Sequence, residues 1–235
     1  MKKLSKIALT LTLALAASST FAAKTEPYTQ PGTDAREMLT TQPIHWVSIE
    51  QIKQSLEGQG PINVSFDIDD TLLYSSPCFY YGKQKYSPDS EAYLKNKEFW
   101  NEINAGCDKY SVPKEVAKEL IKMHQERGDK VFVFTGRPAG DVDGVTPILE
   151  QVFNMKGMHP VEFMGGRQRD TKYNKTPAIK QHNITIHYGD SDDDVLAAKE
   201  AGVRGIRLIR AANSTYLPLP KIGGYGEEVI INSSY

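Results

Sequence analysis

The sequence predicts an α/β protein built on an open, mostly parallel sheet with helices on both faces. Short, continuously apolar runs such as residues 130–134 and 184–188 alternate with segments of helical spacing. Continuous apolar runs are typical of strands that are covered on both faces, and alternation with helices favours parallel pairing. With 235 residues, 40% hydrophobic and 24% charged, the chain has the composition of a globular protein.

The first 22 residues have the pattern of a secretory signal peptide. Lys2, Lys3 and Lys6 precede an uncharged run that ends in small residues at Ala22, which is the usual order of such signals. The apolar core is about 11 residues long, and a transmembrane anchor needs roughly 20. We therefore expect cleavage after Ala22 and a secreted mature protein without a membrane segment.

The rest of the chain divides into an arm and a core. Residues 23–43 are polar and rich in turn formers, and helical spacing follows at Val47, Ile49, Ile52 and Leu56, so residues 23–60 are predicted to be an arm and one helix. Residues 61–235 should form the core. Its predicted strands are residues 62–68, 130–134, 161–164, 184–188, 206–209 and 228–232.

Two helices of the core are clear from their spacing and end signals. Residues 113–128 place Val116, Leu120 and Met123 on one face and end at a glycine. Residues 191–202 have Ser191 in position to cap the helix and Gly202 to stop it.

Residues 74–111 do not fit a simple connection between strand and helix. The segment is rich in aromatic residues, proline and serine, too long for a turn and too irregular for a single helix. We expect an insertion after the first core strand, helical over about residues 91–104, that folds over the sheet edge as a cap. Cys78 and Cys107 lie in it, and both a disulfide and two buried thiols are compatible with a secreted protein of this size.

Charged and oxygen-bearing side chains follow three predicted strands, where open α/β sheets bind their ligands. Asp67 and Asp69 point the same way in an extended chain, residues 135–137 follow the next strand, and Asp190 follows a third. Two carboxylates about 4 Å apart repel by about 4 kcal/mol at an effective dielectric constant of 20. A hard cation offsets this repulsion, so the sequence predicts a Mg²⁺ site.

Four segments now show a resemblance to a known family. "FDIDDTLL", "VFVFTGR", a lysine before the next strand and "YGDSDDD" resemble, in order and spacing, the motifs of the haloacid dehalogenase-like phosphatases. With the signal, the aromatic insertion and the tail "RAANSTYLPLP", the chain is similar to the bacterial class B nonspecific acid phosphatases over nearly its whole mature length. This resemblance implies a Rossmann-like core, Mg²⁺-dependent hydrolysis of many phosphomonoesters, a periplasmic location and a homotetramer.

The resemblance also implies a role for each matching residue. Asp67 would be the nucleophile that takes the phosphoryl group, and Asp69 the general acid and then the general base. The metal would be held by Asp67, the main-chain carbonyl of Asp69 and Asp190, with Asp194 supporting them. Contacts to the phosphate and to an apolar substrate group would come from Thr135, Gly136, Arg137, Lys175, Phe79, Leu94, Trp100 and Tyr216.

Some of these assignments remain open from sequence. Lys175 fits the lysine motif better than Lys172 or Lys180, and Arg137 suits either a phosphate contact or support of its loop. Cys78, beside the expected wall residue Phe79, departs from the family pattern.

The chemistry of phosphoryl transfer supports these roles independently. A carboxylate supplies an in-line nucleophile, and a cation, a lysine and backbone amides disperse the charge of the phosphoryl oxygens. Four aspartates, one lysine and one Mg²⁺ would sum to one negative charge, which repels a phosphate. A proton on Asp69 removes that charge and is also the proton that a departing alkoxide needs, so we expect activity in mildly acidic conditions.

Other features of the sequence exclude alternatives or leave them open. Three of the 28 Lys+Arg lie in the first 22 residues and all 29 Asp+Glu lie beyond them, so the mature chain carries a net charge of −4 and does not suit nucleic-acid binding. The five histidines show no metal-ligand spacing, and His187 is expected in the core. Asp70, Asp192 and Asp193 are expected to cap turns or face water. Phosphotransfer to alcohols and an inactive binding protein on the same fold remain as alternative functions.

Overall fold

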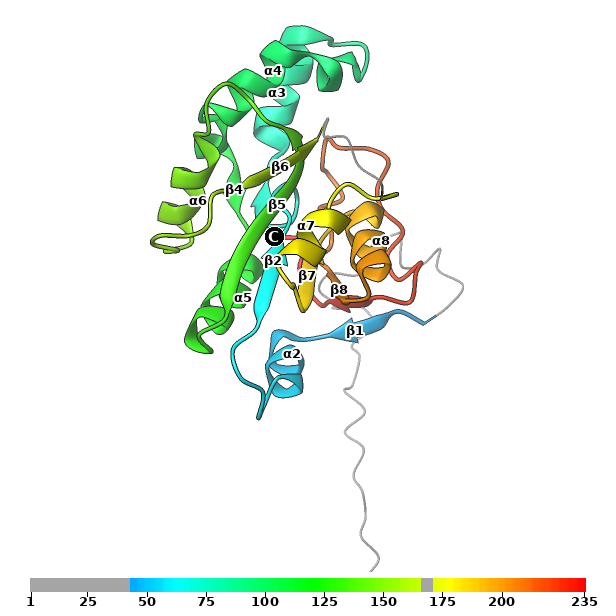
Figure 1. The fold of residues 1–235 in the computed structure, drawn as a ribbon. Helices are drawn as coiled ribbons and strands as arrows, with labels where there is room; N and C mark the ends of the chain where they lie inside the picture. The colour runs from blue at the N-terminus through cyan, green and yellow to red at the C-terminus, as the bar shows by residue number, and fades with distance from the viewer. Residues whose placement is uncertain (1–42, 166–170) are drawn as a thin grey trace, which may run out of the picture. The chain divides into compact units, whose positions relative to one another are not determined.

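The computed structural model describes residues 43–165 and 171–235 (Figure 1). The predicted signal peptide and nearly all of the predicted arm lie outside these residues. Within them, no helix has both the length and the apolar character needed to span a membrane.

A parallel sheet forms the centre of the described chain. Its seven strands run in the order β1-β9-β8-β7-β2-β5-β6, and every neighbouring pair is parallel. The chain moves from β2 outward through β5 and β6, then returns to the other side of β2 at β7. Ligands of open α/β sheets bind beyond the carboxyl ends of strands at such a reversal. The strands are β1 His45–Val47, β2 Asn63–Phe66, β5 Lys130–Pro138, β6 Glu162–Gly165, β7 Ile186–Gly189, β8 Arg204–Arg207 and β9 Glu228–Ile230.

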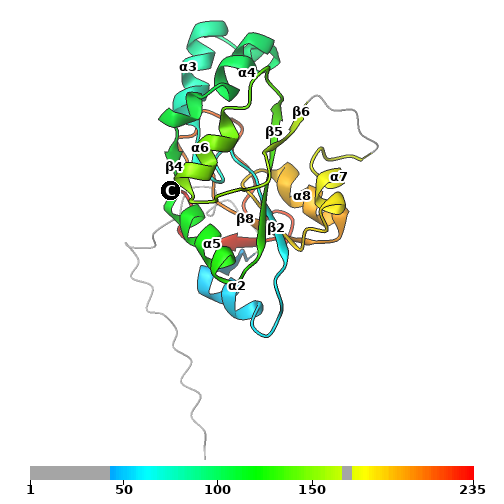
Figure 2. The same cartoon turned by 60° about the vertical axis from the view of Figure 1, so that its left-hand side comes forward.

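Helices cover both faces of this sheet, as predicted (Figure 2). One face carries α2 Ile49–Ser55, α5 Glu115–Glu126 and α6 Val145–Val152, whose apolar side chains share a core with β2 and β7. The other carries α7 Thr176–Gln181 and α8 Asp192–Ala201, packed on Phe134 and Met164. Ser191 caps α8, and Gly202 ends it with φ of 76°. The α/β class predicted from sequence is therefore confirmed.

The structure corrects several predicted boundaries. Val47 belongs to β1, which pairs with β9, and not to the helix, which starts at Ile49 behind the capping residue Ser48. Three residues are too few to show a strand period, so β1 could not be recognised. Pro113 lies in β4 Val112–Pro113, paired with β3 Leu73–Tyr74, and α5 begins two residues later.

The insertion is more helical than predicted. It contains α3 Ser76–Tyr86, the 3₁₀ helices η1 Ala92–Lys95 and η2 Cys107–Tyr110, and α4 Lys97–Asn104. Figure 1 shows α3 and α4 together at one end of the sheet. The segment has its own small core of Cys78, Phe79, Tyr93, Phe99, Trp100 and Ile103.

Helix α3 was missed because its own sequence does not favour it. Gly82 lies in its middle, and a Cβ there would stand 2.1 Å from Cε2 of Phe99. The glycine lets the Phe99 ring lie against the helix backbone. Packing against α4 therefore stabilises a helix that its own residue preferences do not indicate.

Candidate active site

A cavity of about 470 Å³ lies beyond the carboxyl end of β2, between the sheet and the insertion. This volume is typical of small-molecule sites. Most of the sequence-predicted site residues line it: Asp67, Asp69, Asp190 and Asp194 with Gly136, Arg137 and Lys175 on the sheet side, and Phe79, Leu94, Trp100 and Tyr216 opposite.

Asp67 is fixed where β2 ends. Its backbone N–H donates to the Tyr188 carbonyl at 2.9 Å, which extends the pairing of β2 with β7 by one residue. Its buried carboxylate accepts a hydrogen bond from Lys175 Nζ, which also donates to Asp194 Oδ1 at 2.5 Å. Lys172 and Lys180 are exposed, so Lys175 is the one of the three lysines that the fold brings to Asp67.

Asp194 and Asp190 are held by local structure around the start of α8. Asp194 accepts hydrogen bonds from Ser191 Oγ at 2.6 Å, and His187 Nε2 lies 3.2 Å from its other oxygen. Asp190 accepts from Arg210 Nε at 2.5 Å and from Thr71 Oγ1 at 3.2 Å. Because α8 begins directly after β7, both carboxylates lie at the same sheet edge as Asp67.

The three carboxylates form a group that fits a divalent cation. One oxygen from each of Asp67, Asp190 and Asp194 lies within 4.8 Å of the others. Burial raises the pKa of Asp67 well above its usual value; Lys175 lowers it, and the charges of Asp194, Asp190 and Asp69 raise it further. Lys175 pairs with the carboxylates of both Asp67 and Asp194. One positive charge thus faces two negative charges, and the pair of carboxylates keeps an excess of negative charge. Hard oxygen donors in such a group suit Mg²⁺ or a similar ion.

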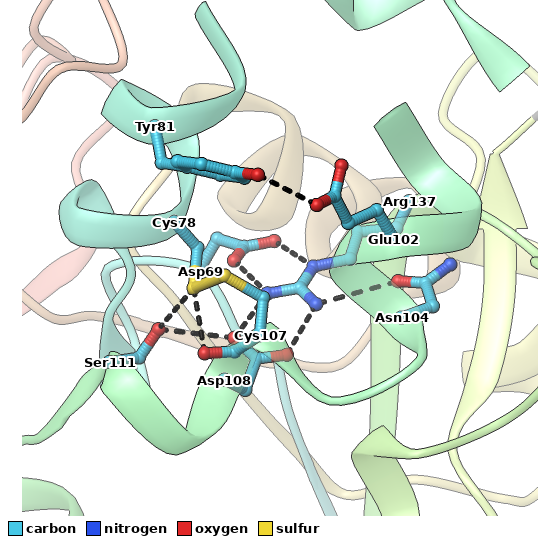
Figure 3. The surroundings of a disulfide bond; sticks show 9 residues. All are labelled: Asp69, Cys78, Tyr81, Glu102, Asn104, Cys107, Asp108, Ser111 and Arg137. Carbon is cyan, nitrogen blue, oxygen red and sulfur yellow. Dashed lines mark hydrogen bonds and ion pairs between the residues drawn. A yellow bond between two sulfur atoms is a disulfide. The ribbon is translucent and has the colours of Figure 1, made fainter. Parts of the chain in front are cut away.

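Asp69 is held by Arg137 through two hydrogen bonds, at 2.9 Å from Nε and 2.5 Å from Nη2 (Figure 3). The other side of the guanidinium donates to Asp108 at 2.6 and 3.0 Å. Burial alone would raise the pKa of Asp69, but Arg137, helped by Ser75 and Lys175, holds that pKa below its usual value. Arg137 therefore stabilises the ionised form of Asp69.

A disulfide joins Cys78 to Cys107, with Cα atoms 5.9 Å apart (Figure 3). This settles the pairing that the sequence left open. Cys78 precedes the wall residue Phe79, and Cys107 precedes Asp108, the second partner of Arg137. The bridge therefore ties one wall of the cavity to the residue that orients Arg137.

Comparisons with known proteins identify the family of this chain. Residues 9–219 match the model of the haloacid dehalogenase (HAD) superfamily, subfamily IIIB (acid phosphatase). The chain belongs to this family. A class B acid phosphatase of Haemophilus influenzae is 71% identical over the full length of both chains, and that of Salmonella typhimurium is 49% identical over 87% of this chain and 86% of its own. The protein is thus an acid phosphatase, a hydrolase of the HAD superfamily.

A solved structure supports the fold. A protein from Clostridium acetobutylicum, described as a predicted phosphatase, aligns with a TM-score of 0.50 over 73% of this chain and 94% of its own. The two sequences are 15% identical, so this likeness concerns the fold alone.

Thr135 of the "TGR" motif of this phosphatase lies differently from expectation, and Arg137 takes one of the two roles left open for it. Thr135 is buried inside β5, accepts the Arg137 backbone N–H at 3.2 Å and does not line the cavity, whereas Gly136 does. Arg137 is 1% exposed, and its nitrogens bind Asp69, Asp108 and Asn104. This arrangement favours the supporting role for Arg137.

Asp70 was expected to cap a turn or face water, and this is wrong. It is 3% exposed, lies at φ of 58° and accepts a hydrogen bond from Ser214 Oγ at 2.6 Å. Burial, with the nearby charge of Asp190, raises the pKa of Asp70 to about 7. Asp192 is half-buried and accepts from Arg207 at 3.0 Å, while Asp193 is exposed as expected.

Arg210 is a site residue that sequence reasoning missed. It pairs with Asp190, and its guanidinium lies 4.4 Å from the centre of the Tyr216 ring. It also donates to the Tyr216 carbonyl at 2.9 Å. Arg210 follows the predicted strand at residues 206–209, so the same inspection of strand ends that found Asp67 would have found it. Asp108 gave no such signal, because it follows no core strand.

The apolar wall comes from the insertion and the tail. Phe79 lies 6.0 Å from Trp100 and 6.4 Å from Tyr216, measured between ring centres. Leu94 packs against the same small core. The sequence-predicted wall residues are therefore brought together and line the same cavity as the carboxylates.

Proposed function

We propose that this acid phosphatase is secreted, requires Mg²⁺ and hydrolyses a broad range of phosphomonoesters, including nucleotides, aryl phosphates and sugar phosphates, through an aspartyl-phosphate on Asp67. The observation that carries the proposal is the placement of the Asp67 carboxylate in the cavity, within 4.8 Å of oxygens of Asp190 and Asp194. Lys175 Nζ donates a hydrogen bond to the same carboxylate. A carboxylate so placed has both a cation site and a fixed positive charge beside it.

The reaction follows from these positions. An Asp67 oxygen attacks phosphorus as the bond to the leaving oxygen breaks, and Asp69 gives that oxygen a proton. Water then attacks the aspartyl-phosphate, Asp69 takes the proton from it, and phosphate departs while Asp67 is restored. Bound Mg²⁺ would offset the charge of the phosphoryl oxygens, and Asp67, Asp190, Asp194 and the Asp69 carbonyl would hold it.

Asp69 must gain its proton after substrate binds. A phosphate dianion beside Asp69 opposes its ionised form and so raises its pKa. Arg137 retains Asp108 as its second carboxylate partner, so the contact with Asp69 can lengthen without leaving a buried guanidinium unpaired. This supports acidic working conditions, since protonation is easier when solution pH is low.

The cavity walls support a broad substrate range. Phe79, Trp100 and Tyr216 present aromatic surface on which a nucleobase or an aryl ring can stack. The carboxylate side recognises only the phosphoryl group, which all phosphomonoesters share. An alcohol that enters in place of water would take the phosphoryl group in the second half-reaction, so phosphotransfer competes with hydrolysis.

Export to the periplasm and assembly into a homotetramer complete the proposal. The order of charged, apolar and small segments in residues 1–22 supports export. The Cys78–Cys107 disulfide supports it as well, because such bonds persist in oxidising compartments. The tetramer rests on the family resemblance, and sedimentation of the secreted protein would measure it.

Chelation and one substitution test the function. Purified protein should hydrolyse an aryl phosphate with Mg²⁺, lose nearly all turnover in a chelator and regain it when Mg²⁺ is returned. Asp67→Asn should abolish turnover and labelling of the protein by phosphate while leaving the fold intact. Asp193→Asn changes an exposed aspartate and should keep both turnover and labelling. Wild-type turnover in Asp67→Asn would exclude the mechanism. Substrate binding without turnover in the wild-type protein would favour the alternative of an inactive binding protein.

A further inference from the structure

Two histidines that are far apart in the sequence meet at one place in the fold. His182 Nε2 lies 2.5 Å from Glu162 Oε1, and His159 Nδ1 lies 4.0 Å from the same oxygen. The three donor atoms all lie within 4.8 Å of one another. The histidines were expected to show no ligand spacing. Their spacing along the chain indeed shows no ligand pattern, but the fold brings two of them together with Glu162.

The group lies at the edge of the sheet opposite to the active site. Glu162 is the first residue of β6, and His159 precedes it in the same connection. His182 is the residue at which α7 ends, while Lys175 stands at the start of that helix, on the active-site side. Since the strands are parallel, their first residues lie at the edge opposite to Asp67, so the two groups of ligands are separate.

Aromatic side chains hold the two imidazoles in place. The ring of Phe132 lies 4.6 Å from His182 and 5.4 Å from His159, and Phe134 lies 5.6 Å from His182, between ring centres. The side chains of His182 and Glu162 are 15% and 16% exposed, and that of His159 is 43% exposed. One side of the group is therefore packed on apolar rings, while the other remains open to solvent.

We propose that His159, Glu162 and His182 bind one divalent transition-metal ion of the Zn²⁺ type, separately from the cation at the active site. Two imidazoles and one carboxylate are a common ligand set for Zn²⁺, with water in the fourth position. The active site offers oxygen donors alone, which suit Mg²⁺. The donor chemistry of the two groups therefore selects different ions.

Binding at this group requires one local change. His159 Nδ1 also lies 2.9 Å from the Pro160 carbonyl, and a nitrogen that donates there carries a proton. Ligation moves that proton to Nε2 and replaces the carbonyl contact with the metal. The ion then joins the first residue of β6 to the end of α7, two elements that are separate in sequence.

Binding of Co²⁺ tests the proposal with a spectroscopic signal. The protein is saturated with Mg²⁺ and titrated with Co²⁺, whose visible absorption reports four-coordinate nitrogen and oxygen ligation. We expect one such ion per chain, displaced by Zn²⁺. His159→Ala and Glu162→Gln should each weaken its binding by at least the roughly 10- to 100-fold that loss of an outer hydrogen-bond partner costs at metal sites.

Matched variants separate this group from the active site and from misfolding. His45→Ala removes an exposed histidine elsewhere and should leave Co²⁺ binding unchanged, as should Asp67→Asn at the active site. Glu162→Gln keeps the shape of the side chain and should retain wild-type phosphatase turnover. If His159→Ala and Glu162→Gln bind Co²⁺ like the wild-type protein, or if the Mg²⁺-saturated protein shows no absorbing Co²⁺, the proposal is wrong.

Discussion

The two sides of the active-site cavity are built in different ways. On the sheet side, Asp67 ends β2, and Asp190 and Asp194 flank the first turn of α8 directly after β7. Their positions follow from the backbone of a parallel sheet. On the other side, Phe79, Trp100 and the residues around Asp108 are placed by a small aromatic core and a disulfide.

This difference separates chemistry from substrate access. The sheet side carries the proposed nucleophile and the carboxylates that suit a cation, so its variants should lower kcat. The insertion carries the apolar wall and the second partner of Arg137, so its variants should change stability and KM. Arg137 is the link, since it binds Asp69 on one side and Asp108 on the other.

After Asp67→Asn, the largest effect is expected from Lys175→Met. Lys175 binds both Asp67 and Asp194, so its loss leaves two buried carboxylates facing each other and removes a charge that offsets the transition state. We expect kcat to fall about 10³-fold, in line with the loss of one electrostatic donor in other enzymes. Steady-state kinetics of Lys180→Met, which changes an exposed lysine of the same helix, provides the control and should match the wild-type protein. Equal rates in both variants would contradict the assignment of Lys175.

Asp108→Asn should cause the largest loss of stability in the insertion. It removes one of two carboxylates from the buried guanidinium of Arg137, and breaking a buried ion pair costs about 3 to 5 kcal/mol. Urea unfolding measures this loss. Asp141→Asn, at a carboxylate whose side chain is 69% exposed, should cost less than about 1 kcal/mol. A cost as small for Asp108→Asn would mean that the ion pair between Asp108 and Arg137 adds little to the stability of the fold.

Replacing both cysteines by serine tests the bridge. The disulfide closes a loop across 29 residues, so its removal should lower the free energy of unfolding by about 3 kcal/mol. At temperatures where the variant is folded, we expect KM for an aryl phosphate to rise while kcat for a small alkyl phosphate changes little. A large loss of kcat for both substrates would show that the chemistry also depends on the insertion.

The raised pKa of Asp70, which follows β2 on the sheet side of the cavity, predicts that the free energy of unfolding depends on pH. The folded protein keeps a proton on Asp70 up to about pH 7, whereas an ordinary aspartate has a pKa of 3.8. Stability from this proton is present below about pH 4 and lost as pH rises toward 7. With a chelator present, the stability of Asp70→Asn should therefore rise relative to that of the wild-type protein between about pH 4 and 7, by about 3 to 4 kcal/mol. The difference between the two unfolding curves measures it, and contributions common to both proteins, such as those of His124 and His187, cancel.

The smallest effect is expected from Phe79→Leu. The ring contacts Trp100 and Tyr216, and aromatic pairs contribute about 1 kcal/mol beyond the area they bury. KM for an aryl phosphate or a nucleotide should rise several-fold, while KM for a small alkyl phosphate stays unchanged. Tyr80→Leu, at the exposed neighbouring position, is the control. An equal rise in KM for both kinds of substrate would place Phe79 outside the substrate wall.

Local signals in the sequence predicted much of the fold and of the site. Ser191 and Gly202 mark the ends of α8 because capping and left-handed backbone depend on residues within one turn. Asp67 and Asp190 were found because the end of an apolar run marks the end of a strand. Strand β1 and helix α3 were missed, since β1 is too short to show a period and α3 depends on the packing of Phe99 at Gly82.

By itself, the sequence determined the parallel α/β core and the residues that its strand ends present, because a strand period and a helix cap are properties of a few neighbouring residues. Only the tertiary structure decided which distant side chains meet. It joined Cys78 to Cys107, placed Asp108 against Arg137 and brought His159 to His182. Such contacts depend on how separate segments pack, and the spacing of residues along the chain carries no record of that.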